Sequence, residues 1–411
     1  MLDYRSFKNE FFKVGISRSA ILYVFLAVII GGLIGVVDAI FGRGLIYITE
    51  FRDGHALYLI PFLTLAGLLI VYLYKNFGKD SQKGMGLIFE AGNHGREDIP
   101  KRLVPLIVFS TWLSHLFGAS VGREGVAVQI GGVIGHAIGK KLSAKEAKKI
   151  LLITGMAAGF AALFQTPIAA TFFAIEILML GKIEYRALIP ALVGSYVASW
   201  TSNYLGLEKF SFAINTNIHL DPLVLLKLAI IAVCFGLVGR FFAESLAFMK
   251  ATVAKRIANP YQRIILMGIV ISIGLLVIHM DRYAGLGTNL IGLSFNGGHI
   301  NGYDWILKLI FTVLSISAGF QGGEVTPLFA IGSTLGAALA MLFGLPVEFV
   351  AAAGYVSIFS AATNSYFGPI FIAAEVFGFG SVQYILPIMT IAYVLNGNSS
   401  IYAQEVLNLE V

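Results

Sequence analysis

Charged side chains are scarce in this chain of 411 residues. Lys, Arg, Asp and Glu together make up 13% of it, whereas an ordinary soluble domain carries about 25%. Hydrophobic residues account for 57%, and the mean hydropathy is +0.82. So few charges cannot cover the surface of a water-soluble monomer of this size. The composition therefore excludes a soluble monomer and predicts a protein embedded in a lipid bilayer.

Cysteine and the common cofactor motifs are also nearly absent. The single cysteine, Cys234, allows no internal disulfide, and the scattered histidines lack metal-ligand spacing. There is no P-loop, and GLGTNLIG has neither the spacing nor the strand context of a dinucleotide site. We therefore expect no metal and no cofactor. The polar N-terminus MLDYRSFKNE predicts no cleavable signal peptide.

Two further classes are disfavoured by the loops. The loops are short and carry no nucleophile, metal or nucleotide motif, so we expect no enzyme activity; a membrane enzyme that uses glutamates as acid and base is a weaker alternative. The net charge of +6 comes mostly from basic residues in short loops beside apolar segments. That placement is typical of membrane topology and predicts no nucleic-acid partner.

Long and short apolar segments alternate from residue 19 to residue 395. Many are shorter than the about 20 residues that a perpendicular membrane span needs, and the segment 150–180 is broken at Pro167. Broken segments are tolerated at membrane depth only where their free backbone groups face protein or a wet cavity. The sequence therefore predicts an all-α, polytopic membrane fold whose tilted and broken helices line a pathway.

An internal repeat organises these segments. GMGLI at 84–88 recurs as GLGTNLI at 285–291, and GREGVAVQIGGVIG from Gly122 recurs loosely as GGEVTPLFAIGSTLG from Gly322. PALVGSYVAS from Pro190 recurs as PIMTIAYVLN from Pro387. The three matches keep the same order and nearly the same spacing. We interpret residues 1–411 as one transmembrane domain built from two homologous halves, 15–205 and 220–411.

The basic residues predict how the two halves are oriented. Positive charge gathers before the first span, in the loop 139–149, and after the first span of the second half, whereas the junction 205–221 has only Lys209. Because Lys and Arg favour the cytoplasmic side, the first half is predicted to start inside and the second outside. The result is an inverted repeat, a fold that places its ion site near the midplane. No Lys or Arg follows Lys308, so charge does not orient the last hundred or so residues.

Two glutamates carry the predicted chemistry. Glu124 lies between glycines at the start of an apolar helix, where free N–H groups and the positive end of the helix dipole attract anions. Glu324 holds the matching place in the second half, followed by Thr326 and Pro327. An ionisable group at membrane depth is costly and is functional by default. We predict that both acids lie at facing helix starts and share one site with exchangeable protons, which disfavours a purely structural membrane scaffold.

The ordered motifs resemble the CLC family of anion channels and proton-coupled antiporters. GREG before a glycine-punctuated helix, GGEVTP in the second half, PIAATFFAIE after a helical break and a C-terminal Tyr402 carry the resemblance. It implies a CLC-type inverted repeat, a homodimer with an independent pore in each subunit, and a gating glutamate that alternates with the anion. It also implies a multi-pass protein of the cell membrane, here a bacterial plasma membrane with its lipid.

Two departures from the chloride-handling pattern narrow the resemblance. Met85 stands where those members have a serine, and Val126 stands where they have a proline. This combination is similar to the fluoride clade, which exports fluoride in exchange for protons; a chloride-conducting CLC exchanger or channel stays the alternative. The resemblance implies that Glu124 is the gating glutamate and Glu324 an inner acid, and it assigns the anion path to Met85, Arg123, Gly125, Val325, Thr326 and Tyr402.

Overall fold

The computed structural model describes residues 18–214 and 221–406. Three basic residues that support the predicted cytoplasmic start lie outside the described residues: Arg5, Lys8 and Lys13. Three of the bounds of the predicted halves, positions 15, 220 and 411, also lie outside them. The α-helices are α2 (Arg18–Leu59), α3 (Leu63–Leu73), α4 (Met85–Asn93), α5 (Leu103–Leu116), α6 (Glu124–Gly139), α7 (Lys145–Phe164), α8 (Pro167–Glu176), α9 (Leu188–Tyr204), α10 (Pro222–Arg256), α11 (Pro260–Val277), α12 (Thr288–Phe295), α13 (Asp304–Ala318), α14 (Val325–Phe343), α15 (Val347–Thr363), α16 (Phe367–Phe377) and α17 (Val382–Val394).

Short elements connect these helices. They are η1 (Ile60–Phe62), η2 (Tyr74–Gly78), η3 (Lys79–Lys83), η4 (Tyr185–Ala187), η5 (Met280–Tyr283) and η6 (Phe379–Ser381). Two strands of two residues each, β1 (Met179–Leu180) and β2 (Glu405–Val406), pair in parallel and tie the C-terminal segment to the end of α8. The described chain is therefore almost wholly helical, as predicted.

The predicted break at Pro167 is confirmed. α7 ends at Phe164, Gln165 adopts a left-handed conformation with φ of 56°, and Pro167 begins α8. Proline suits the first turn of a helix because its missing N–H would have no partner there. A long helix and a short one are therefore joined at a sharp turn.

Helices α10 and α11 face outward, whereas α7 and α14 lie inside. Candidate membrane spans include Glu146–Phe164, 89% buried, and Val325–Phe343, 78% buried, whereas Pro222–Arg256 and Pro260–Val277 are only 33% and 28% buried. Side chains such as Phe248 and Val277, exposed by 70% and 77%, cover the outer helices with apolar surface. Such an apolar surface suits contact with lipid tails, whereas the interior helices pack against other helices.

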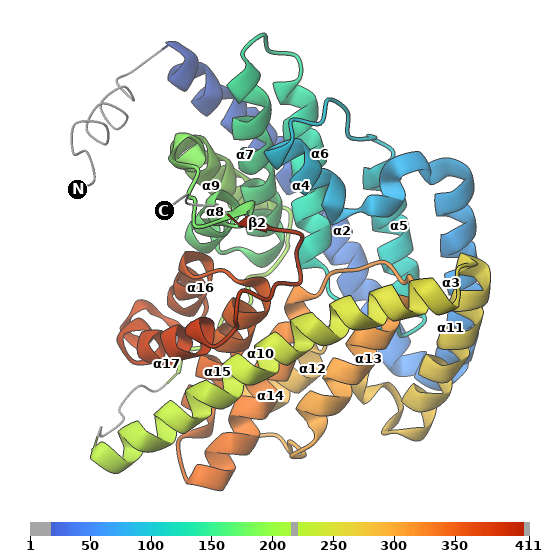
Figure 1. Ribbon diagram of the computed structural model, residues 1–411, viewed down its shortest axis with the longest axis vertical. Helices are drawn as coiled ribbons and strands as arrows, with labels where there is room; N and C mark the ends of the chain where they lie inside the picture. The colour runs from blue at the N-terminus through green and yellow to red at the C-terminus, as the bar shows by residue number, and fades with distance from the viewer. Residues whose placement is uncertain (1–17, 215–220, 407–411) are drawn as a thin grey trace.

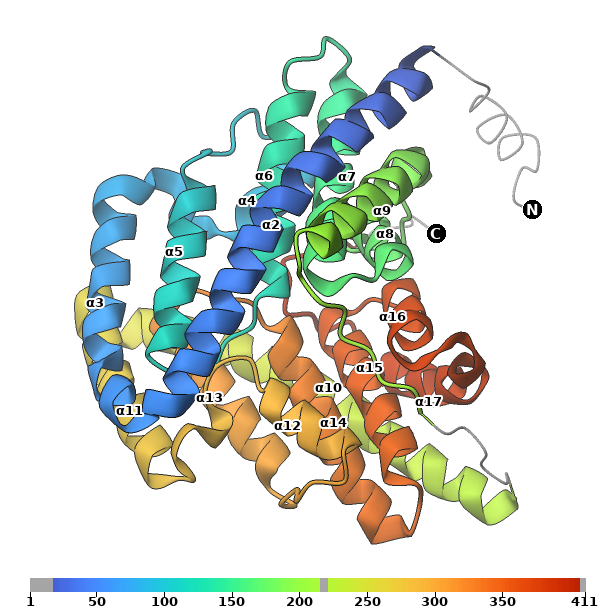
Figure 2. The same ribbon diagram turned by 180° about the vertical axis from the view of Figure 1, so that it is seen from behind.

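Two pairs of helices pack through glycine in the same way. A Cβ atom on Gly131 of α6 would lie 2.0 Å from the carbonyl oxygen of Gly155 on α7, and one on Gly332 of α14 would lie 2.2 Å from that of Gly354 on α15. Close backbone approach of this kind needs a residue without a side chain. In Figure 1 the blue-to-green pair α6–α7 lies above the orange pair α14–α15, and Figure 2 shows the same order from behind.

Two carboxylates join α8 to α16. Glu176, the last residue of α8, accepts N–H bonds at 2.5 Å from Tyr366, 3.0 Å from Phe367 and 3.3 Å from Gly368, where α16 begins. Glu375 of α16 accepts bonds from the start of α8, at 3.2 Å from the nitrogen of Ile168 and 2.8 Å from that of Ala169.

Each helix therefore caps the N-terminus of the other, so α8 and α16 run antiparallel. A carboxylate at a helix start satisfies free N–H groups and matches the helix dipole. Glu176 thus caps α16, whereas Glu244 of α10 pairs with Arg240 at 2.7 Å.

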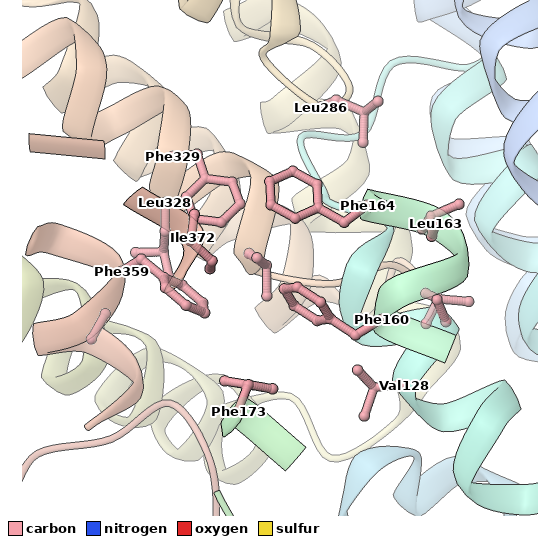
Figure 3. Close-up of a cluster of buried hydrophobic side chains, with 14 of the residues drawn as sticks. Val128, Phe160, Leu163, Phe164, Phe173, Leu286, Leu328, Phe329, Phe359 and Ile372 are labelled. Atoms are coloured by element: carbon pink, nitrogen blue, oxygen red, sulfur yellow. The ribbon is translucent and has the colours of Figure 1, made fainter. Parts of the chain in front are cut away.

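Aromatic side chains fill the contact between the N-terminal and C-terminal helices. Phe164 of α7 stacks on Phe329 of α14 at 5.4 Å, and Phe329 stacks on Tyr355 of α15 at 4.0 Å. Figure 3 shows Phe160 and Phe164 directed toward Phe329 and Phe359 across this contact. The buried cluster holds together the two groups of helices whose starts form the site.

A buried lysine joins the loops that precede α6 and α12. Lys308 of α13 is fully buried, and its ammonium donates to Ser120 Oγ at 2.9 Å, to the carbonyl of Tyr283 at 3.1 Å and to that of Gly285 at 2.7 Å. Three acceptors satisfy all three of its N–H donors, which is what makes a buried lysine tolerable. Ser120 precedes α6, and Gly285 precedes α12, so this cation ties an N-terminal loop to a C-terminal one.

Candidate functional site

The starts of α6 and α14 meet at the centre of the protein. Gly122 donates its N–H to the carbonyl oxygen of Gly323 at 2.5 Å, and Gly323 returns a bond to Gly122 at 2.8 Å, as an isolated antiparallel bridge. A Cβ atom on Gly122 would lie 2.9 Å from the oxygen of Gly323, so the approach needs glycine. The predicted meeting of the two helix starts is confirmed.

Glu124 places its carboxylate between the two helix starts. The side chain is fully buried. Its Oε2 accepts a hydrogen bond from the Thr326 hydroxyl at the start of α14 and one from the Arg123 nitrogen at 3.4 Å. Its Oε1 accepts from Arg123 Nε at 3.3 Å. Donors from two helix starts far apart in the sequence therefore converge on one buried carboxylate.

Glu324 lies between the neighbourhood of Glu124 and helix α10. It is the residue before α14, and its side chain is 14% exposed. A Cβ atom on Gly125 would lie 3.9 Å from Glu324 Oε2, and Glu324 Oε1 lies 3.6 Å from Lys250 Nζ on α10. The surrounding sequence is free of charge, whereas in space a cation from a distant helix lies close to this acid. Glu324 therefore bridges the neighbourhood of Glu124 and a partly exposed lysine.

Met85 and Tyr402 both lie at α4: Met85 is its first residue, and Tyr402 packs against its Phe89. Tyr402 is 9% exposed, and its ring stacks on Phe89 of α4 at 5.8 Å and meets the edge of Phe173 of α8 at 6.3 Å. Met85 begins α4 and packs against the hydrophobic core. The aromatic contacts hold Tyr402 inside the protein, so it does not act as an interfacial anchor.

The remaining predicted site residues lie within the same two helix starts. Arg123 precedes α6, and Gly125 follows Glu124 in its first turn, while Val325 is 1% exposed as the first residue of α14. Gly125 and Val325 contribute backbone at the helix starts, where N–H groups lack partners within the helix. The structure thus brings six of the predicted residues together at the starts of α6 and α14. The other two, Met85 and Tyr402, lie at α4.

Sequence reasoning missed Gln129, Tyr355 and Lys250. Gln129 of α6 is 7% exposed, its Oε1 has no hydrogen-bond partner among the described residues, and a Cβ atom on Gly84 would lie 3.3 Å from it. This amide therefore contacts the turn that precedes Met85. A lone glutamine in the run VAVQIGG was a usable signal, because an apolar helix seldom buries an amide without a purpose. Tyr355 and Lys250 have no local sequence signal, since only the fold brings them close.

Comparisons with known proteins identify the family. A family model described as voltage gated chloride channel matches residues 66–397. The chloride/fluoride channel protein of Pseudomonas syringae pv. tomato (strain ATCC BAA-871 / DC3000) is 35% identical over 388 residues, which cover 92% of this chain and 84% of the relative.

Three solved structures share the fold. A crystal structure of a CLC-type fluoride/proton antiporter superposes with a TM-score of 0.92 at 48% identity, covering 94% of this chain and 98% of that one. A slow cyanobacterial Cl⁻/H⁺ antiporter gives 0.79 at 22% identity, covering 91% and 94%. A eukaryotic CLC transporter gives 0.70 at 16% identity, covering 92% and 71%, and like the cyanobacterial protein it shows the fold alone. This polytopic membrane protein belongs to the voltage gated chloride channel family, or CLC family.

Proposed function

We propose that this protein is a secondary transporter that exports fluoride across the plasma membrane in exchange for protons. One observation carries the proposal: the fully buried Glu124 carboxylate lies between two helix starts and accepts a hydrogen bond from the Thr326 hydroxyl. The likeness, at 48% identity, to a CLC-type fluoride/proton antiporter supports fluoride and protons as its ions.

Competition for one set of donors explains the exchange. A charged Glu124 is a tethered anion that engages Thr326 and the Arg123 donors. Once protonated, the side chain loses its charge and most of its attraction to these donors. Fluoride is small and strongly hydrated, so it takes the vacated position only where several N–H and O–H groups replace its water. Each entry of fluoride is thereby linked to a proton on Glu124.

Glu324 extends the proton route toward the cytoplasm. Its carboxylate lies near Gly125 on one side and near Lys250 on the other. Lys250 belongs to the basic segment that the charge distribution assigns to the cytoplasmic side. Protons that enter on Glu124 from outside then leave through Glu324, while fluoride moves outward. In this scheme the acids carry ions and catalyse no covalent reaction.

The proposal includes the two-half organisation and a homodimer. The run of helices α4 to α9 corresponds in order to the run α12 to α17. In each run two neighbouring helices, α6 with α7 and α14 with α15, pack through glycine. These correspondences support halves at 15–205 and 220–411 in inverted orientation. Membership of the CLC family supports a homodimer with a pore in each subunit; the molar mass in detergent, measured by light scattering, tests it.

Chloride is the second candidate substrate. The Pseudomonas relative is named a chloride/fluoride channel protein, which favours chloride passage as an exchanger or a channel. Proteoliposomes loaded with either anion separate the two, with fluoride and chloride electrodes recording efflux. We expect fluoride to leave much faster than chloride.

Glu124→Gln tests the role of the buried acid in the same assay. Glutamine keeps the size of the side chain but cannot exchange a proton, so we expect fluoride exchange to fall by about tenfold or more. Glu348→Gln is the matched control, because Glu348 also lies in the first turn of a helix but is exposed. Wild-type fluoride exchange by Glu124→Gln would refute the proposed mechanism.

A further inference from the structure

An ion pair links α10 to the start of α14. Lys250 Nζ lies 3.6 Å from Glu324 Oε1, with the lysine side chain 44% exposed and the glutamate 14% exposed. Among the described residues, Lys250 is the one cation within ion-pair distance of Glu324. Figure 1 shows α10 crossing obliquely over the orange helices, and α10 packs against α13, α14 and α15.

The pair gives Glu324 a defined direction. One carboxylate oxygen lies 3.9 Å from where a Cβ atom would stand on Gly125, next to Glu124, and the other faces Lys250. Glu324 makes no hydrogen bond that caps its own helix. Without Lys250, no ion pair among the described residues would hold this flexible side chain toward the outer surface of α10.

We propose that Lys250 is a positioning residue for the proton branch of transport, one that holds Glu324 where it exchanges protons with the cytoplasm. This role rests on the proposed fluoride/proton exchange. A half-exposed ion pair contributes little to folding stability, because water and salt screen it. Its value lies in the geometry of transfer, since a proton moves efficiently only between groups held within hydrogen-bond reach.

Lys250 and the anion path have separate tasks under this proposal. Fluoride is held by Thr326 and by donors at Arg123, none of which contacts Lys250 in the described structure. Removing Lys250 should therefore slow proton transfer more than fluoride binding. The ratio of proton flux to fluoride flux is the readout that a merely structural lysine would not change.

The experiment measures proton and fluoride fluxes together in proteoliposomes of the full-length protein. We expect Lys250→Met to lower the proton-to-fluoride ratio about twofold to fivefold, the effect of losing an exposed ion pair, while the KM for fluoride stays near the wild-type value. Lys250→Arg should restore the ratio because it keeps the charge. Lys255→Met is the matched control, since Lys255 is exposed on the same helix and forms no ion pair among the described residues.

Two further measurements identify Glu324 as the partner. Raising the salt concentration should lower the ratio in the wild type and leave Lys250→Met unchanged, because only an intact pair is screened. Glu324→Asp keeps the acid but draws it back from Lys250, so adding Lys250→Met to Glu324→Asp should cause no further loss, since the two residues act through one contact.

Several outcomes would overturn the assignment. A wild-type ratio in Lys250→Met, an equal loss in Lys255→Met, or an additive loss in the double variant would each show that the pair does not position Glu324. A wild-type protein that moves fluoride without protons would instead refute the proposed function, and the inference with it. The wild-type trace therefore separates the two kinds of failure.

Discussion

At the scale of single residues, the site depends on hydroxyl and N–H donors that meet at one buried carboxylate. Thr326 crosses from α14 to reach Glu124 at the start of α6, so one hydroxyl joins the two helix starts. Most buried hydroxyls on nearby helices bond instead to their own backbone, as Thr334 does to the carbonyl of Ala330 at 2.7 Å. The position of the hydroxyl, and not its mere presence, makes Thr326 a functional candidate.

Thr326→Val should therefore lower fluoride exchange by about tenfold or more. A hydrogen bond to a charged group is worth about 1.5–3 kcal/mol, and valine keeps the shape while removing the donor. Thr326→Ser should retain most of the rate. Thr334→Val serves as the control on the same helix, and fluoride efflux from liposomes is the measurement. Equal rates for Thr326→Val and Thr334→Val would show that the Thr326 hydroxyl does not bind the ion.

At the scale of helices, the site is held by close backbone contact and by reciprocal caps. Glycines let α6 approach α7 and let α14 approach α15, so each site-bearing helix is supported by a partner directly behind it. Glu176 and Glu375 join α8 to α16 from opposite ends. Both devices set the positions of helix starts, which are the groups that would face the anion under the proposed function.

Gly131→Ala should destabilise the protein by about 1–3 kcal/mol, since the new Cβ atom would lie 2.0 Å from the Gly155 oxygen and the helices would have to separate. Gly32→Ala is the control, because no atom lies within 4 Å of a Cβ atom there; alanine should leave stability unchanged or raise it slightly. Thermal unfolding in detergent measures both. A melting temperature for Gly131→Ala as high as that of Gly32→Ala would contradict the packing argument.

Removing the cap on α16 should also lower stability. Glu176→Ala leaves the N–H groups of Tyr366, Phe367 and Gly368 without their acceptor, at a cost of about 1–2 kcal/mol. Glu244→Ala removes an acid that is 51% exposed and should cost about 0.5 kcal/mol or less. Thermal unfolding compares the two variants. If both lose the same stability, the Glu176 carboxylate is not an effective cap.

At the scale of the whole molecule, the sequence predicted the class of fold and the helix starts that form the candidate site. It did not predict the residues that surround these helix starts. Local sequence patterns predict helix starts and glycine-rich turns, because the signals lie in neighbouring residues. Such patterns pointed to Glu124, Thr326 and the broken helix at Pro167. The contacts of Lys250 with Glu324, and of Tyr402 with Phe89, join segments far apart in the chain. Only the packing of α10 and the path of the C-terminal segment bring these residues together.

The buried lysine illustrates the same limit. Lys308 is the last cationic residue of the sequence, and lysine side chains are mostly exposed to water in proteins. The structure instead buries it in α13 with three oxygen acceptors, two of them backbone carbonyls. Backbone acceptors leave no trace in the residue types, so this environment could not be predicted from sequence.

The most direct test of the account is proton movement driven by a fluoride gradient. Liposomes loaded with fluoride, with valinomycin and potassium to remove the membrane potential, are diluted into fluoride-free medium of equal pH, and a pH electrode follows the outside solution. Wild-type protein should make the medium alkaline as fluoride leaves and protons enter, and Glu324→Gln should abolish this change. Fluoride efflux that leaves the external pH unchanged in the wild type would contradict the claim that buried acids exchange with the anion.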